Sequence, residues 1–137
     1  MNTTATPSDD PVALWHRALK SKDTRLLDDL LADEVVFLSP VVHTPQVGRK
    51  ITKAYLSAAF FVFVNDTFRY VRELRGERDA VLEFTLELDG IQINGVDMMR
   101  WNDAGKLTEF KVMLRPLKAV NLIHQKMGQA LQAAKPA

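Results

Sequence analysis

The chain has 137 residues, of which 47% are hydrophobic, and its 18 basic and 17 acidic residues leave a net charge of +1. This length indicates one domain with a sizeable core. The balanced charge argues against a surface for nucleic acids or anionic membranes, and the absence of cysteine excludes disulfides and thiolate chemistry.

The sequence contains no recognisable targeting or membrane segment. Its longest apolar run, residues 58–64, is too short to cross a bilayer. Residues 1–10 lack the basic and apolar regions of a signal peptide. No pair of His, Asp or Glu has the spacing of metal ligands. We therefore expect a cytoplasmic protein with no metal, no cofactor, and neither a nucleic-acid nor a membrane partner.

Apolar residues at helical spacing predict four helices. The first begins where Asp10 provides an N-cap and Pro11 the first helical position. Asp23 caps a second, short helix, and Gly48 precedes the third. The helices are expected from residue 11 to 20–22, shortly after Asp23, over about 49–63, and from Pro116 onward. The domain organisation is expected to be a flexible tail over 1–9, a single domain over 10–132, and a tail over 133–137.

Between the third and fourth helices the apolar pattern changes to the two-residue period of strands. Asp89-Gly90 is the strongest hairpin signal in the chain, and Asn94-Gly95 suggests a bulge. Strands are expected at 35–38, 67–74, 80–88, 91–101 and 107–114. Helices packed on one face of an antiparallel sheet make an α+β domain. A long, bulged sheet curls, so we expect a cone with a pocket inside.

An aspartate, Asp97, lies in the middle of an apolar strand, where a carboxylate is disfavoured. If it faces the interior, strand parity places Ile93, Gly95, Met99 and Trp101 on the same face. Desolvation would then raise the pKa of Asp97, and the neutral acid could donate a hydrogen bond or a proton to a ligand. The alternative is a structural carboxylate that binds a backbone amide or Trp15, or that faces a dimer partner.

The remaining site candidates are weaker. His43, in the loop after the first strand, is a candidate base at the mouth of the pocket. Tyr55 stands out among the apolar candidates because a buried hydroxyl needs a partner. All of the wall candidates could equally be ordinary core. The expected pocket wall comprises Trp15, Phe37, Ser39, Tyr55, Phe84, Met99, Phe110 and Val112.

The order of elements and several short motifs resemble the nuclear transport factor 2-like superfamily, which includes ketosteroid isomerase, scytalone dehydratase and the SnoaL-like polyketide cyclases. The resemblance covers about residues 10–132 and implies a curved antiparallel sheet wrapped around helices, a cone-shaped or cystatin-like roll. Because the fold hosts many reactions, it does not imply one of them. The motifs are residues 18–23, residues 30–35, Ser39-Pro40, the helix start at Gly48, and Val96-Asp97 through Gly105-Lys106-Leu107.

The resemblance also assigns roles to individual positions. Asp97 falls where ketosteroid isomerase has its oxyanion-hole aspartic acid and where SnoaL-like cyclases have an acid/base aspartate. Trp15 falls at the oxyanion-hole tyrosine of the isomerase, and Ser39 at its proton-shuttling aspartate. Val112 stands where epoxide hydrolases of this fold carry a carboxylate. Since serine cannot replace a carboxylate base near neutral pH, the chain departs from the isomerase pattern at Ser39.

These features predict a SnoaL-like protein whose apolar pocket binds a small hydrophobic molecule. Two alternatives stay open: a cyclase- or isomerase-like enzyme that uses Asp97 as acid/base, and a non-catalytic dimeric scaffold. A homodimer is expected through the outward face of the sheet, because apolar and charged residues mix there as in protein interfaces. That face would carry Val71, Val96, Met98 and Met113 among Glu83, Thr85, Glu87, Arg100 and Lys111.

Overall fold

The computed structural model describes residues 10–134; the predicted tail over 1–9, and residues 135–137 of the predicted C-terminal tail, lie outside the described residues. The elements follow in the predicted order, with one additional short strand. The helices are α1 (Pro11–Ser21), α2 (Leu26–Leu30), α3 (Arg49–Phe63) and α4 (Leu117–Ala133). The strands are β1 (Leu31–Leu38), β2 (Gln46–Val47), β3 (Arg69–Arg75), β4 (Asp79–Leu88), β5 (Ile91–Trp101) and β6 (Leu107–Arg115).

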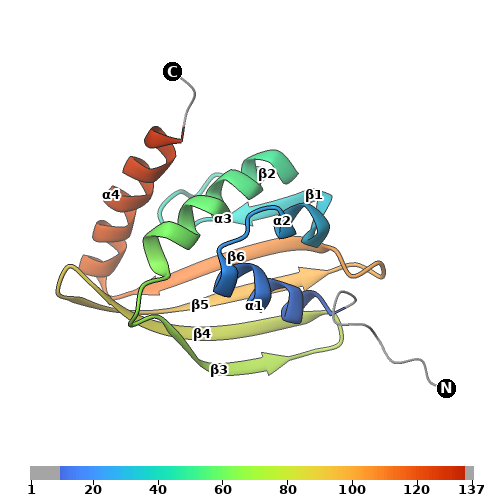
Figure 1. Cartoon of the computed structure of the whole chain (residues 1–137), viewed down its shortest axis with the longest axis horizontal. Helices are drawn as coiled ribbons and strands as arrows, with labels where there is room; N and C mark the ends of the chain where they lie inside the picture. Colours follow the sequence, from blue (N-terminus) through green and yellow to red (C-terminus); the bar gives the residue numbers. More distant parts are fainter. Residues whose placement is uncertain (1–9, 135–137) are drawn as a thin grey trace.

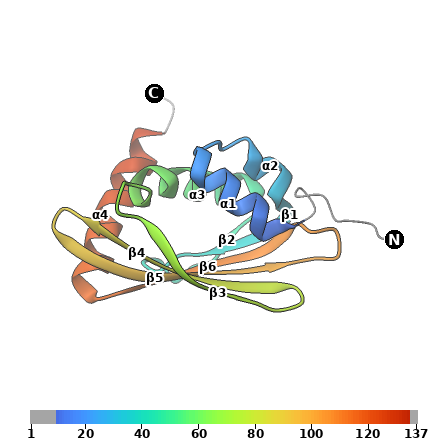
Figure 2. The ribbon, with the colours of Figure 1, turned by 60° about the horizontal axis from the view of Figure 1, so that its bottom comes forward.

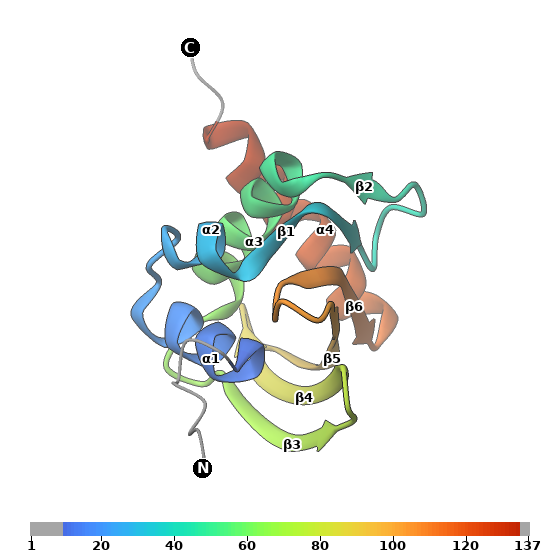
Figure 3. The same cartoon turned by 90° about the vertical axis from the view of Figure 1, so that its right-hand side faces the viewer.

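The strands form one sheet in the order β2-β1-β6-β5-β4-β3. Strand β1 runs parallel to β6, and every other neighbouring pair is antiparallel. Helices α1, α2 and α3 lie over one face of the sheet, with α4 beside α3 at one end (Figures 1 and 2). Viewed from the side in Figure 3, the sheet is strongly curved toward the helices. The predicted α+β fold, a curved antiparallel sheet wrapped around helices, is confirmed.

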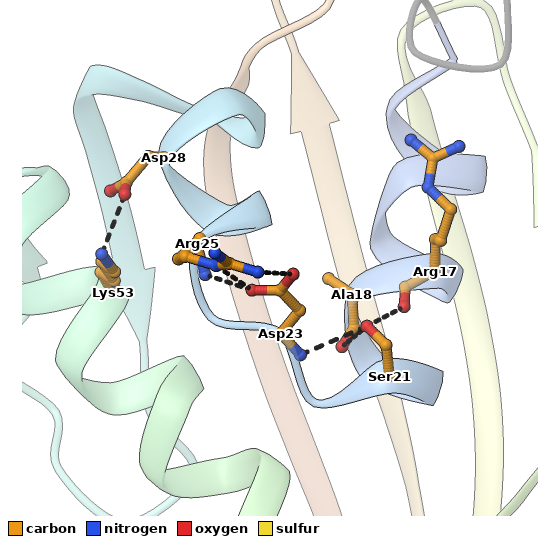
Figure 4. Close-up of polar contacts among 7 residues, drawn as sticks. All are labelled: Arg17, Ala18, Ser21, Asp23, Arg25, Asp28 and Lys53. Atoms are coloured by element: carbon orange, nitrogen blue, oxygen red, sulfur yellow. Dashed lines mark hydrogen bonds and ion pairs between the residues drawn. The ribbon is translucent and has the colours of Figure 1, made fainter.

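Local interactions accompany the start and end of α1 and the turn that leads into α2. The Asp10 carboxylate accepts a hydrogen bond from the Val12 amide at 3.0 Å, and Lys22 ends α1 with a φ of +55°. In the turn before α2, Asp23 accepts hydrogen bonds from the amide and the guanidinium of Arg25 (Figure 4). The predicted N-cap at Asp10 is confirmed. The predicted cap at Asp23 is wrong, because α2 begins at Leu26 with Arg25 as its N-cap residue and has no side-chain cap.

Two features of the sheet differ from the prediction. Strand β1 begins at Leu31, four residues before the predicted start, because Leu31 pairs with Leu107 in the parallel arrangement. The predicted bulge at Asn94-Gly95 is wrong, since pairing between β4 and β5 is continuous along both strands. The irregularity in β5 falls instead between Arg100 and Trp101, where the register with β6 shifts.

Gly95 has a packing role instead of a bulge. A Cβ atom at this position would lie 2.6 Å from the ring of Phe84, 2.6 Å from the carbonyl oxygen of Met113 and 2.7 Å from the side chain of Leu114. Only glycine therefore lets the Phe84 ring lie directly on strand β5.

The buried residues form two clusters on the helix-covered face. The first cluster packs α1, α2 and α3 against β1, β4, β5 and β6, and it includes Trp15, Leu30 and Phe110. The second packs α3 and α4 against β4 and β5 around Phe84 and Ile123. Three partly buried residues contact both clusters: Tyr55, Tyr70 and Val112. No described helix is long and apolar enough to span a membrane.

Candidate functional site

A cavity of about 60 Å³ lies where the two clusters meet. Its wall is almost entirely apolar, and Asp97 is the one acidic residue among the described residues that border it. Helices α1, α3 and α4 and strands β1, β4, β5 and β6 all contribute to the wall, together with the loops after β1 and α3. Eight of the bordering residues are aromatic: Trp15, Phe37, Tyr55, Phe60, Phe63, Phe68, Phe84 and Phe110.

Seven of the eight predicted wall residues border this cavity, and Met99 does not. Met99 lies on the same face of β5 as Asp97, as parity predicted, but it is only 2% exposed and packs within the first cluster. Strand parity gives the face of a residue. Parity does not say how far along the strand the cavity extends. Met99, the next residue after Asp97 on this face of β5, does not border it.

His43 is exposed in the loop between β1 and β2 and does not border the cavity. It lies instead along a surface groove that Lys111 and Met113 of β6 also border. His43 was predicted to act as a base at the mouth of the cavity, but its imidazole lies outside the cavity wall.

The carboxyl group of Asp97 is held by a chain of two hydrogen bonds. The Tyr70 hydroxyl donates to Oδ2 of Asp97 at 2.5 Å, and the indole N–H of Trp15 donates to the Tyr70 oxygen at 2.8 Å. Asp97 is only 7% exposed. Within residues 10–134 no donor reaches its second oxygen, Oδ1, and the residue borders the cavity. One predicted alternative was a direct hydrogen bond between Asp97 and Trp15. The structure links these two residues only indirectly, through the Tyr70 hydroxyl.

The positions of the three residues follow from the sheet register and from aromatic packing. Tyr70 on β3 pairs with Phe84 on β4, and Asp97 on β5 pairs with Leu82, so the Tyr70 side chain reaches Asp97 diagonally across β4. The Trp15 ring packs against the ring of Phe110 on β6, with the two centroids 4.7 Å apart. The indole N–H can only donate, which leaves the Tyr70 hydrogen directed at Asp97.

Burial raises the pKa of Asp97 from 3.8 to about 7, and the hydrogen bond from Tyr70 opposes this rise only in part. The pKa of Tyr70 is held well above its ordinary value, first by burial and then by the charge of Asp97. The direction predicted for Asp97 is therefore correct, and its cause is desolvation as expected. A carboxyl group with this pKa holds a mixture of neutral and ionised forms near neutral pH.

Tyr70 is the residue that sequence reasoning missed. Strand parity does place it on the same side of β3 as Phe68, but the flanking arginines gave the strand the pattern of an exposed edge. The register shift between Tyr70 and Arg72 further breaks the alternation after this residue. Only the pairing of β3 with β4, which no local pattern specifies, brings Tyr70 to Asp97.

Two other polar side chains border the cavity. The Ser39 hydroxyl accepts a hydrogen bond from the Val41 amide at 3.1 Å, which holds the loop after β1 in place. Tyr55 is half-buried, and its ring stacks on Phe37 with centroids 5.2 Å apart. Among residues 10–134 no group of three His, Asp or Glu side chains could hold a metal ion.

The chain belongs to the SnoaL-like domain family, which matches residues 12–110 and is part of the nuclear transport factor 2-like superfamily. No protein with curated annotation matches the sequence. Among solved structures, the chain is similar to a steroid delta-isomerase from Pseudomonas aeruginosa, with 30% identity, a TM-score of 0.86 and 97% of each chain covered.

Two further structures extend this similarity. An uncharacterised protein with a cystatin-like fold from Silicibacter pomeroyi DSS-3 shares 29% identity with a TM-score of 0.77, over 90% of this chain and 83% of the other. SalBIII, an epoxide hydrolase/cyclase-like enzyme of pyran ring formation in the polyether salinomycin, shares 16% identity with a TM-score of 0.63. That match covers 77% of this chain and 88% of SalBIII, and at this identity it supports the fold alone.

Proposed function

We propose that the cavity binds a small hydrophobic molecule whose polar group reaches Asp97. The observation that carries this proposal is the Asp97 carboxyl group: the residue is only 7% exposed and borders an apolar cavity, and among residues 10–134 only Tyr70 donates to it, at Oδ2. Ligand sites typically combine an apolar wall with a few polar groups that orient the ligand. The small cavity favours a ligand of few atoms over a drug-sized one.

Filling the cavity should abolish binding without destabilising the protein. Ala59 borders the cavity from α3, and Ala59→Leu would place three more carbon atoms in it. We expect at least a tenfold loss of affinity for cyclopentanol, whose hydroxyl can donate to or accept from Asp97. The melting temperature should stay the same or rise, because a filled cavity gains contacts.

The measurement uses the fluorescence of Trp15 in a Trp101→Phe background, since these are the two tryptophans of the chain. Ala54→Leu is the matched control, because Ala54 is exposed on the same helix. The control variant should bind cyclopentanol like the parent protein. Equal binding by the Ala59→Leu variant would show that the ligand does not enter this cavity.

A second candidate is catalysis of a proton transfer by Asp97. It is supported by the 30% identity to the protein described as a steroid delta-isomerase and by a carboxyl pKa of about 7, which suits an acid or base near neutral pH. Asp97 is also the only carboxylate of the described residues that borders the cavity, so it would have to both accept and return the proton. A delta-isomerase assay of the parent protein and Asp97→Asn tests this: turnover that Asn abolishes would favour catalysis over simple binding.

We also propose that the protein forms a homodimer through the sheet face that faces away from α1–α3. Met113 and Val71 are each 52% exposed on this face, and Met98 lies between them and is half-buried. Sedimentation at micromolar concentration should give about twice the 15.5 kDa mass of one chain. Met98→Glu should dissociate the dimer, and Leu117→Glu, an exposed position on α4, should not. A monomer in the parent protein would contradict this proposal.

A further inference from the structure

We propose that the ligand of the cavity is a small organic cation, such as a methylated ammonium group, held between the aromatic wall and the carboxylate of Asp97. This inference rests on the proposed function, because it names the chemistry of the molecule that the cavity binds. Three properties of the cavity support it: the absence of a cationic side chain beside Asp97, the direction of the hydrogen-bond chain, and the composition of the wall.

Among the described residues that border the cavity, the charge of Asp97 has no cationic partner. None of the described residues that border the cavity is Lys, Arg or His. Among residues 10–134, the donor to the carboxyl group is the neutral Tyr70 hydroxyl. A buried carboxylate is costly unless it is paired with a positive charge. A cation in the cavity, next to Oδ1, would supply that charge.

The hydrogen-bond chain is directed so that it stabilises the ionised form of Asp97. Trp15 donates to Tyr70, and Tyr70 donates to Oδ2 of Asp97, so each donor points toward the carboxylate. A ligand carbonyl would need a neutral Asp97 that donates from Oδ1, and the hydrogen bond from Tyr70 favours the ionised form over this neutral one. A cation needs only the acceptor that the chain already maintains.

The wall of the cavity suits a cation as well as an apolar molecule. Aromatic side chains make up eight of the nineteen bordering residues. The faces of aromatic rings attract organic cations, and cages of such rings are a known means of binding quaternary ammonium groups. The cavity of about 60 Å³ limits the buried part of the ligand to a compact group.

The titratable groups around Asp97 are few and lie on other elements. Tyr70 of β3 contacts it directly, and Tyr55 of α3 borders the same cavity. Behind Tyr70, the His16 ring of α1 lies edge-on to the Tyr70 ring at 5.2 Å between centroids and binds Glu73 of β3 at 2.9 Å. The residues that α4, β4 and β6 contribute to the wall are all apolar. The charge of Asp97 therefore controls binding in the range around pH 7.

The test compares tetramethylammonium, whose charge does not depend on pH, with tert-butanol, a neutral molecule of similar shape. Binding of each is measured by the fluorescence of Trp15 at constant ionic strength, at pH 6 and pH 8. With a pKa of about 7 for Asp97, tetramethylammonium should bind about tenfold more tightly at pH 8 than at pH 6, because the ionised fraction rises by about that factor. At pH 8 tert-butanol should bind more weakly than tetramethylammonium. The affinity for tert-butanol should be nearly the same at pH 6 and pH 8.

Two variants separate the carboxylate from the rest of the wall. Asp97→Asn should lose tetramethylammonium binding at both pH values and retain the weak binding of tert-butanol. Tyr70→Phe removes the donor to Oδ2, so it should shift the rise in tetramethylammonium binding to higher pH and leave tert-butanol unaffected. Because the parent protein alone gives the pH dependence, the test holds even where a variant folds poorly.

The outcomes distinguish this inference from the function on which it rests. Binding of tert-butanol or cyclopentanol that Ala59→Leu abolishes, with no binding of tetramethylammonium, would overturn the cation and leave the hydrophobic site standing. Tetramethylammonium binding that does not change between pH 6 and pH 8 would also overturn it. If none of the three molecules binds, both proposals fail.

Discussion

Gly95→Ala should be among the most destabilising single substitutions in this chain. The added methyl group would lie within 2.7 Å of three atoms, and one of them is the carbonyl oxygen of Met113, which is part of the backbone of β6. A flexible side chain could move away, but a carbonyl in the pairing between β5 and β6 cannot move without breaking that pairing. We expect a loss of about 2–4 kcal/mol, at or above the usual cost of overpacking, and a melting temperature lower by roughly 8 °C or more.

The same substitution at a second glycine provides the control. Gly128 is exposed within α4, and a Cβ atom there would meet nothing within 4 Å. Gly128→Ala should therefore stabilise the protein by about 0.5–1 kcal/mol, the usual gain in a helix interior. Thermal melts of both variants make the comparison. Similar effects of the two substitutions would mean that Phe84 and β6 are not packed against Gly95 as described.

Gly95→Ala should also disturb the cavity, because the displaced Phe84 ring is part of its wall. This ring stacks on Phe68 at 5.3 Å and meets Phe63 edge-on at 5.8 Å between centroids. Both of these residues border the cavity as well. Gly95 therefore allows both the packing of Phe84 on β5 and the shape of the cavity wall that Phe84 helps to form.

The fold was predictable because the relevant signals are local. Asp10-Pro11 starts α1 through a cap and a preset backbone angle, and Asp89-Gly90 turns β4 into β5 with positive φ angles at both residues. The short strand β2 was missed, since it has only two residues. The early start of β1 was missed because Asp33 and Glu34, both exposed, interrupt its alternation.

The candidate site was predictable only in part, because it depends on contacts between distant strands. Asp97 was predicted from its own strand alone, because a carboxylate among apolar residues is unusual whichever strands it pairs with. Tyr70 was missed because its importance comes from the register of β3 against β4. Gly95 was noticed but interpreted as a bulge, since a glycine required for close packing has the same local pattern as one required for a kink.

Asp97→Asn should make the protein more stable at pH 8 and should bring little advantage at pH 4. Burial raises the pKa of Asp97 in the folded protein to about 7, from 3.8 in the absence of burial. Between these two values the folded state holds a proton that the unfolded state has lost, so the free energy of unfolding falls as the pH rises from about 4 to about 7. Above pH 7 both states are ionised, and the full penalty remains.

The magnitude follows from the same two values. Their difference corresponds to about 4 kcal/mol, which is an upper bound because the buried amide of Asn has a cost of its own. The shape of the site is kept, since the Asn side-chain oxygen can accept the Tyr70 hydrogen bond as Oδ2 does now. We expect a melting temperature higher by several degrees to about 10 °C at pH 8, shrinking toward zero at pH 4.

Thermal melts of both proteins at pH 4, 6 and 8 measure this dependence, and Asp66→Asn is the matched control. Asp66 is exposed in the turn after α3, so the same change of charge there should alter the melting temperature by no more than about one degree at any pH. A loss of stability in Asp97→Asn at pH 8 would mean that the carboxylate is already paired with a positive charge in the folded protein. In that case neither a neutral acid nor a cation-binding carboxylate could be assigned to Asp97, because both roles require that the protein itself leaves this charge uncompensated.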